Sequence, residues 1–196
     1  LRDATPPQAP SPASDLRLLY IGGDSPLKGA DVIRRVAEAL RHVDRWRIDA
    51  YGLVAQRNPP PQLRVHTEFE PAELSRIMGD SDVLVIPSIA RESYSIAARE
   101  ALAAGLPVIT SDCLGPEEVV VNGVNGLVVP TGDVGALADA IRQLIGPTPL
   151  LAELRRNTAD HAVTTRSSED HGAGLIELYR SAISSGSLST PVVEDP

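Results

Sequence analysis

Residues 82–110 of the chain read DVLVIPSIARESYSIAAREALAAGLPVIT. The apolar run at 82–86 ends at Pro-Ser, and such a run is typical of a strand that is covered on both faces of a parallel sheet. A polar loop then leads into an Ala-rich helix at 96–104, which stops at a glycine, and a second buried strand follows at 107–110. The stretch predicts the strand, helix, strand unit from which doubly wound α/β sheets are built.

The same alternation continues on both sides of this unit. Further strands are predicted at 16–21, 46–52, 63–66 and 127–129, and helical apolar stripes at 32–40, 74–78, 137–145 and 175–183. We therefore expect a Rossmann-like α/β domain over 15–184, with ligands at the carboxyl ends of the strands. The Pro- and Ser-rich stretches 1–14 and 185–196 lack periodicity and are interpreted as a linker and a flexible tail.

Composition narrows the possible functions. The chain has 196 residues, a formal net charge of −8 and only 3% aromatic residues, so the core must be aliphatic. A net negative charge argues against a broad surface for nucleic acid or anionic lipid.

The single Cys113 and scattered histidines favour a reducing, cytoplasmic setting without a Cys-based metal site. No apolar run reaches the ~20 residues of a membrane span. Because the sequence begins with Leu, we expect it to be a piece of a longer chain.

Two loops carry residue types suited to chemistry. The loop 22–29 combines Gly22 and Gly23 with Lys28 before a helix, a pattern that suits a phosphate but is equally compatible with ordinary turn chemistry. The loop 88–96 leads into a helix and is flanked by Glu92 and Glu100. On spacing alone these two acids are better explained as solvent-facing residues than as ligand-binding ones.

The stretch 87–112 resembles the donor-binding half of the retaining GT-B glycosyltransferases of the GT4 family, whose signature is E-x7-E. Glu92 and Glu100 have that spacing. The segments 27–31, 80–88, 115–130 (GPEEVVVNGVNGLVVP) and 133–138 also resemble family segments and come in the family's order. The resemblance covers about residues 15–184. It implies a Rossmann-like domain that forms one half of a GT-B architecture.

The resemblance also implies roles for individual residues. Lys28 and Glu92 are the implied catalytic residues: Lys28 would contact the donor diphosphate, and Glu92 would bind the hydroxyls of the transferred sugar. Glu100 would bind the ribose. The remaining implied donor-binding residues are Gly22, Gly23, Ser93, Tyr94, Ser95 and Ile96, through their backbones. Carboxylates suit sugar hydroxyls, while Lys and helix amides suit a diphosphate leaving group. The implied reaction needs a nucleotide-diphosphate sugar as donor, no metal or other cofactor, and an amino-terminal acceptor domain of the same polypeptide.

Two departures from the family pattern keep other functions open. Gly23 stands where the family usually has an Arg, and Ser93-Tyr94-Ser95 replaces Gly-Phe-Gly, although Arg91 offers a compensating charge. The alternatives are a non-catalytic nucleotide-sugar-binding or scaffolding module and a related GT-B epimerase or phosphorylase.

Three further positions favour structural explanations. His66 is interpreted as a strand-edge residue, with a nucleotide pocket as the alternative for His66 to Glu70. Cys113 is predicted to be a small packing residue. The pair Arg155-Arg156 is predicted to lie on a solvated helix face.

Overall fold

The structure is a computed structural model that describes residues 15–146, 149–160 and 168–184. It comprises two units, Leu1–Val163 and Thr164–Pro196. The described part of the second unit is one helix, α6 (Ser168–Ser184), which confirms the helical stripe predicted at 175–183. Several apolar side chains of α6 are exposed, Tyr179 and Ile183 among them. The linker 1–14 and the tail 185–196 lie outside the described residues.

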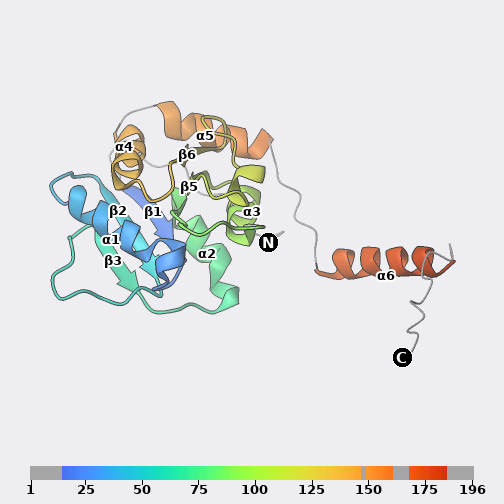
Figure 1. The fold of residues 1–196 in the computed structure, drawn as a ribbon. Coiled ribbons are helices and arrows are strands. Elements are labelled where there is room, and N and C mark those ends of the chain that lie inside the picture. Colours follow the sequence, from blue (N-terminus) through green and yellow to red (C-terminus); the bar gives the residue numbers. More distant parts are fainter. Residues whose placement is uncertain (1–14, 147–148, 161–167, 185–196) are drawn as a thin grey trace, which may run out of the picture. The chain divides into compact units, whose positions relative to one another are not determined.

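A six-stranded parallel sheet forms the centre of the first unit (Figure 1). Its strands are β1 (Leu16–Tyr20), β2 (Trp46–Tyr51), β3 (Leu63–His66), β4 (Val83–Ile86), β5 (Val108–Ser111) and β6 (Gly126–Val129). Their order across the sheet is β3-β2-β1-β4-β5-β6. The chain therefore winds outward from β1 in one direction, returns to β4 and winds outward in the other. This confirms the predicted doubly wound, Rossmann-like fold.

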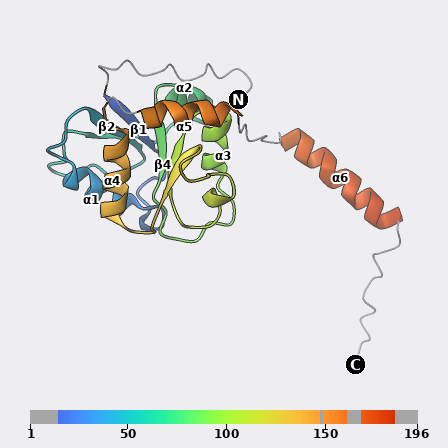
Figure 2. The same cartoon turned by 90° about the horizontal axis from the view of Figure 1, so that it is seen from above.

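Helices cover both faces of the sheet (Figure 2). The longer ones are α1 (Ala30–Ala39), α2 (Leu74–Gly79), α3 (Ile96–Ala103), α4 (Val134–Leu144) and α5 (Pro149–Asp160), and the 3₁₀ turns are η1 (Pro26–Lys28), η2 (Pro71–Glu73) and η3 (Pro116–Glu118). One apolar cluster joins α1, α4 and α5 to the sheet, and a second joins α2 and α3 to it. Aliphatic side chains dominate both clusters, as the low aromatic content predicts.

The burial of the strand residues shows which strands are covered on both faces. All four residues of β4 are buried, and so are all four of β5, because helices cover both of their faces. In β2, buried Trp46, Ile48 and Ala50 alternate with partly exposed residues, so one face of this strand is only partly covered. The period of two in the sequence thus marks the strand with one partly covered face, and the continuous apolar runs mark strands that are covered on both faces.

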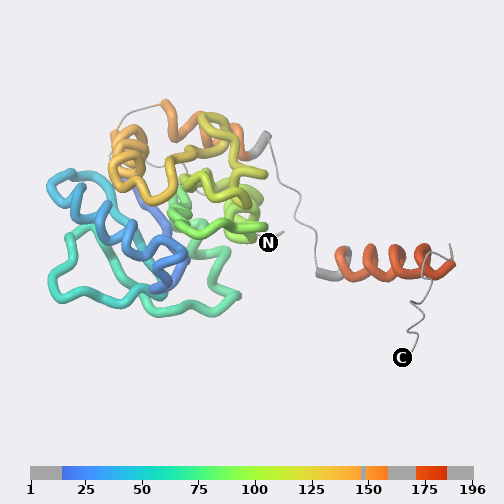
Figure 3. The backbone as a smooth tube through the Cα atoms, in the orientation of Figure 1, coloured from blue at the N-terminus to red at the C-terminus, as the bar shows by residue number. Residues whose placement is uncertain are grey.

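The loops after β1 and β4 meet at the point where the strand order reverses (Figure 3). The carbonyl of Leu27 accepts hydrogen bonds from the amides of Ile89 and Ala90, at 2.9 and 3.2 Å. Gly29 has a φ of +82°, and a Cβ atom at this position would clash with the Pro87 carbonyl. The two loops therefore approach each other closely only because residue 29 is a glycine.

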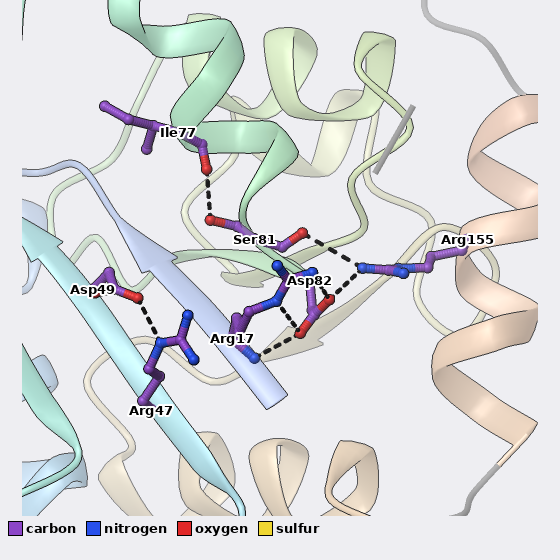
Figure 4. Close-up of polar contacts among 7 residues, drawn as sticks. All are labelled: Arg17, Arg47, Asp49, Ile77, Ser81, Asp82 and Arg155. Atoms are coloured by element: carbon purple, nitrogen blue, oxygen red, sulfur yellow. Dashed lines mark hydrogen bonds and ion pairs between the residues drawn. The ribbon is translucent and has the colours of Figure 1, made fainter. Parts of the chain in front are cut away.

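An ion cluster closes the opposite, amino edge of the sheet (Figure 4). Arg17 of β1 donates from Nε and Nη2 to the fully buried Asp82, at 3.1 and 2.9 Å. Arg155 of α5 donates to the same carboxylate at 2.6 Å. The prediction of a solvated helix face is therefore wrong for Arg155, whose side chain is only 11% exposed, and confirmed for the exposed Arg156. Arg155 ties α5 to the sheet through a carboxylate that the sequence places 73 positions away.

Candidate functional site

Lys28 and Glu92 meet across the point where the strand order reverses. Lys28 ends the turn η1 after β1, and Glu92 lies in the loop after β4. The Lys28 Nζ donates to Glu92 Oε1 at 2.8 Å, although 64 positions separate them in sequence. The Lys28 side chain is 50% exposed and the Glu92 side chain 11% exposed. Two residues predicted for the same site from separate segments thus lie in direct contact.

Glu92 is held in place by its own loop and by the loop after β5. The buried Ser88 hydroxyl donates to the Glu92 carboxylate. The Glu92 amide donates to the Cys113 carbonyl and the Gly115 amide donates to the Glu92 carbonyl, both at 2.8 Å. Between those partners Leu114 adopts a φ of +80°, which is rare for a residue with a side chain. Three loops therefore fix the position of one carboxylate.

The surroundings of Glu92 favour its ionised form. Burial, the largest single influence, would raise its pKa, but hydrogen bonds from Lys28 and Ser88 together with the charge of Lys28 outweigh burial and lower the pKa. An ionised carboxylate accepts hydrogen bonds and donates none. At neutral pH this side chain is suited to bind hydroxyl or amine groups rather than to donate a proton.

Gly22 and Gly23, which follow β1, differ in the structural reason for a glycine at each position. A Cβ atom on Gly22 would clash with the buried Tyr20 ring, so this glycine serves the packing of the strand. Gly23 has a φ of +63° and open space where a Cβ would lie. The amides of Lys28 and Gly29 donate to the carbonyls of Ser25 and Pro26, so these two amides are engaged within the turn, while the half-exposed Lys28 side chain can reach a ligand.

The predicted anion-binding loop ends at the start of α3. Buried Ser95 caps the helix by accepting a hydrogen bond from the Ala98 amide, at 3.4 Å. No described residue accepts a hydrogen bond from the amides of Ser93, Tyr94 or Ile96. Those amides lie at the positive end of the helix dipole, directly after Glu92. The arrangement is suited to bind an anion.

Glu100 lies inside α3 and is half-buried. Within the described ranges no hydrogen-bond donor contacts its carboxylate, and burial raises its pKa. The neighbouring Arg99 does not pair with it: Arg99 donates to Glu118 at 2.6 Å and stacks on the Tyr94 ring at 3.6 Å. A half-buried carboxylate with no described hydrogen-bond donor can accept hydrogen bonds from a ligand.

The remaining candidate residues have structural roles or no contact. Cys113 is buried and packs in the core, as predicted. His66 ends β3, contacts Asp49 at 2.7 Å and stacks on Tyr51, which fits a strand-edge residue. Arg91 is exposed and contacts no other described side chain.

Sequence reasoning assigned no role to Ser88, to Gly115 or to the pair of Asp24 and Arg34. Asp24 precedes Lys28 in the same loop, and its charge is neutralised by Arg34, which also contacts Asp31. The only signal for Ser88 was its place at the end of a buried strand. The partners of Asp24 lie 10 and 30 positions away, beyond the reach of local patterns.

The described residues contain neither a membrane-spanning helix nor a cluster of metal ligands. No helix among them is both long and apolar enough to cross a membrane. Nor do the residues of the three described ranges contain a group of His, Cys, Asp and Glu side chains arranged to hold a metal ion.

Parallel strands in the order 3-2-1-4-5-6, with helices on both faces, define the class of Rossmann-like, doubly wound α/β domains. Residues 2–161 match the family described as Glycosyl transferases group 1, and the chain belongs to that family.

Two relatives illustrate the match. The D-inositol 3-phosphate glycosyltransferase of Rhodococcus erythropolis is 34% identical over 186 residues, which are 93% of this chain and 37% of the relative. The phosphatidyl-myo-inositol mannosyltransferase of Mycobacterium leprae is 34% identical over 154 residues, 72% of this chain and 40% of the relative. The chain thus spans about two fifths of the length of these curated relatives.

Solved structures share the fold at lower identity. Sucrose-phosphate synthase from Thermosynechococcus elongatus matches with a TM-score of 0.72 and 22% identity, over 89% of this chain and 47% of that one. HepE of Anabaena in complex with UDP matches with a TM-score of 0.71 and 20% identity, over 87% of this chain and 50% of that one.

Proposed function

We propose that this chain is the donor-binding half of a retaining glycosyltransferase, and that it binds a nucleotide-diphosphate sugar between the loops after β1 and β4. The observation that carries the proposal is the 2.8 Å contact of Lys28 with Glu92. That contact lies beside amides at the start of α3 that donate to no described residue, and Glu100 follows on the same helix. A cation, an anion-binding helix start and two carboxylates match the groups of such a donor.

In this proposal each group of the donor has a partner. The diphosphate replaces Glu92 as the acceptor of the hydrogen bond from Lys28. It also accepts hydrogen bonds from the amides of Ser93 to Ile96. Glu92 then accepts hydrogen bonds from hydroxyls of the transferred sugar, and Glu100 accepts them from the ribose. Lys28 stabilises the charge that develops on the leaving phosphate. That phosphate takes the proton of the attacking acceptor hydroxyl, so the reaction requires no metal and no protein base.

The comparisons support this assignment from outside the site. A structural relative, HepE, is recorded in complex with UDP and with UDP-glucose. Relatives longer than this chain are consistent with an acceptor-binding domain that precedes it in the same polypeptide. We further propose a cytoplasmic location, because a single buried thiol suits a reducing compartment.

Calorimetric titration of the chain with UDP-glucose, GDP-mannose and ADP-glucose tests the proposal. One of the three should bind, and Lys28→Ala should weaken that binding about 10- to 100-fold, because a hydrogen bond to a charged group is lost. Arg35→Ala is the matched control, since it removes an exposed positive charge from α1. The assignment is wrong if the folded chain binds none of the three, or if Lys28→Ala binds as tightly as the unmodified chain.

A non-catalytic binding module is the second candidate, and it rests on Gly23. The guanidinium of Arg34 is engaged by Asp24 and Asp31, so Lys28 is the one cation in contact with Glu92 among the described residues. Slow release of free sugar from the bound nucleotide sugar, abolished in Lys28→Ala, would favour the enzyme. Tight binding without any release over days would favour the module.

A further inference from the structure

A small polar cavity lies over strands β1 and β2, on the face of the sheet that carries α2. Its volume is about 210 Å³, and it is lined by Arg17, Arg47, Asp49 and Tyr51 together with the end of α2. Pockets for drug-sized ligands usually measure about 300–1,000 Å³, so this cavity suits a smaller group. None of the residues assigned to the donor site lines it.

Two arginines face this cavity from neighbouring strands. The register pairs Arg17 directly with Arg47, and both lie second in their strands, at the amino edge of the sheet. Like charges opposite each other in a sheet repel, so nearby anions must compensate them. Arg17 donates to Asp82, and the Arg47 Nε donates to Asp49 at 3.0 Å (Figure 4).

The compensating carboxylates are shared with further cations. Asp82 also accepts from Arg155 at 2.6 Å, and Asp49 also contacts His66 at 2.7 Å. Three guanidinium groups therefore contact two carboxylates at this edge. Asp80 also lines the cavity, and its side chain is 68% exposed and contacts Arg76, which also pairs with Glu73.

Hydrogen-bond donors of both arginines remain available. Within the described ranges no acceptor contacts Arg17 Nη1 or either terminal nitrogen of Arg47. Planar guanidinium groups bind the oxygens of phosphate and carboxylate in pairs, which an ammonium group does not. We propose that this cavity binds a small phosphate, either the free ion or a phosphate monoester, between Arg17 and Arg47. The site is independent of the proposed donor site.

An NMR titration of the 196-residue chain with inorganic phosphate, at ionic strength held constant with chloride, tests this proposal. The amides of Arg17 and Arg47 should shift saturably. Arg47→Gln should weaken phosphate binding at this cavity at least about tenfold, and Arg47→Lys, which keeps the charge but loses the planar fork, should weaken it less. The exposed Arg35→Gln should bind as the unmodified chain does.

Lys28→Ala separates the two sites, because it should leave the shifts at Arg17 and Arg47 unchanged whether or not the donor assignment is correct. A parallel titration with glycerol phosphate identifies the source of the group: tighter binding than inorganic phosphate indicates a phosphorylated metabolite, and equal or weaker binding indicates the free ion. Absence of saturable shifts with both probes would overturn the proposal. So would equal phosphate affinity in folded Arg47→Gln.

Discussion

The amino and carboxyl edges of the sheet carry similar charged residues, but these residues differ in their hydrogen-bond partners and in their exposure. At the amino edge the fully buried Asp82 is bound by Arg17 and Arg155, so its oxygens have protein partners. At the carboxyl edge Lys28 is half-exposed and the Glu100 carboxylate has no described donor. A buried carboxylate bound by protein donors stabilises the fold, whereas a carboxylate with no described donor is available to a ligand.

Residues with positive φ angles lie at both edges of the sheet. At the carboxyl edge Gly23, Gly29 and Leu114 have positive φ angles, and three loops converge on Glu92. At the amino edge α5 covers the strand ends, where Asn157 donates to the Val124 carbonyl just before β6. Arg45, which directly precedes β2 at the amino edge, also has a positive φ, so unusual backbone conformations are not confined to the edge where the candidate ligand-binding groups lie.

Removing the buried carboxylate should have the largest effect on stability. Asp82→Ala leaves Arg17 and Arg155 without their shared partner, and breaking a buried ion pair in this way costs about 3–5 kcal/mol. Urea unfolding followed by circular dichroism measures the loss. Asp139→Ala is the control, because its exposed pair with Arg142 should contribute about 1 kcal/mol or less. Similar losses for the two variants would contradict the structural role of Asp82.

A comparison of two glycines at the carboxyl edge should give the next largest effect. Gly29→Ala and Gly23→Ala both place a side chain at positive φ, which costs about 1–2 kcal/mol. Only Gly29→Ala also creates a clash, with Pro87, and overpacking adds about 1–3 kcal/mol. The free energy of unfolding should therefore fall further for Gly29→Ala. Equal losses would show that the two loops separate easily and that their close approach does not fix Lys28.

Most of the fold could be predicted from sequence because local patterns determine it. The buried runs at β4 and β5, the alternation in β2 and the glycine stops each have a local cause. The same patterns failed for Arg155, which lies on a polar stretch of helix but binds a carboxylate in a distant segment. Local sequence gives helical propensity and periodicity, but it contains no information on which distant carboxylate a long side chain will reach.

The candidate site shows the same limit. The resemblance to the E-x7-E signature predicted its main side chains, but the contacts of Glu92 with Lys28, Cys113 and Gly115 depend on three loops meeting. The spacing also could not show how Glu92 and Glu100 differ. Glu92 accepts hydrogen bonds from protein donors, whereas Glu100 has no described donor. That difference is set by tertiary neighbours rather than by position in the motif.

The two glutamates should respond to pH in opposite directions, with effects of about 1 kcal/mol or less because water screens both sites. Glu92 has a lowered pKa, so its ionised form contributes stability above the ordinary value of 4.5, and this contribution is lost as pH falls through the lower folded pKa. Glu100 has a raised pKa, so its ionised form reduces stability as pH rises from 4.5 through the raised folded pKa.

Substitution by glutamine should separate these contributions. At pH 7 Glu92→Gln should lower the urea midpoint and Glu100→Gln should raise it, and both differences should disappear well below pH 4, where both carboxylates are protonated. Glu153→Gln, an exposed acid on α5, should change little at any pH. If Glu100→Gln lowered the midpoint at pH 7, Glu100 would have a stabilising protein partner, and the contrast between Glu100 and Asp82, whose oxygens are bound by protein donors, would be wrong.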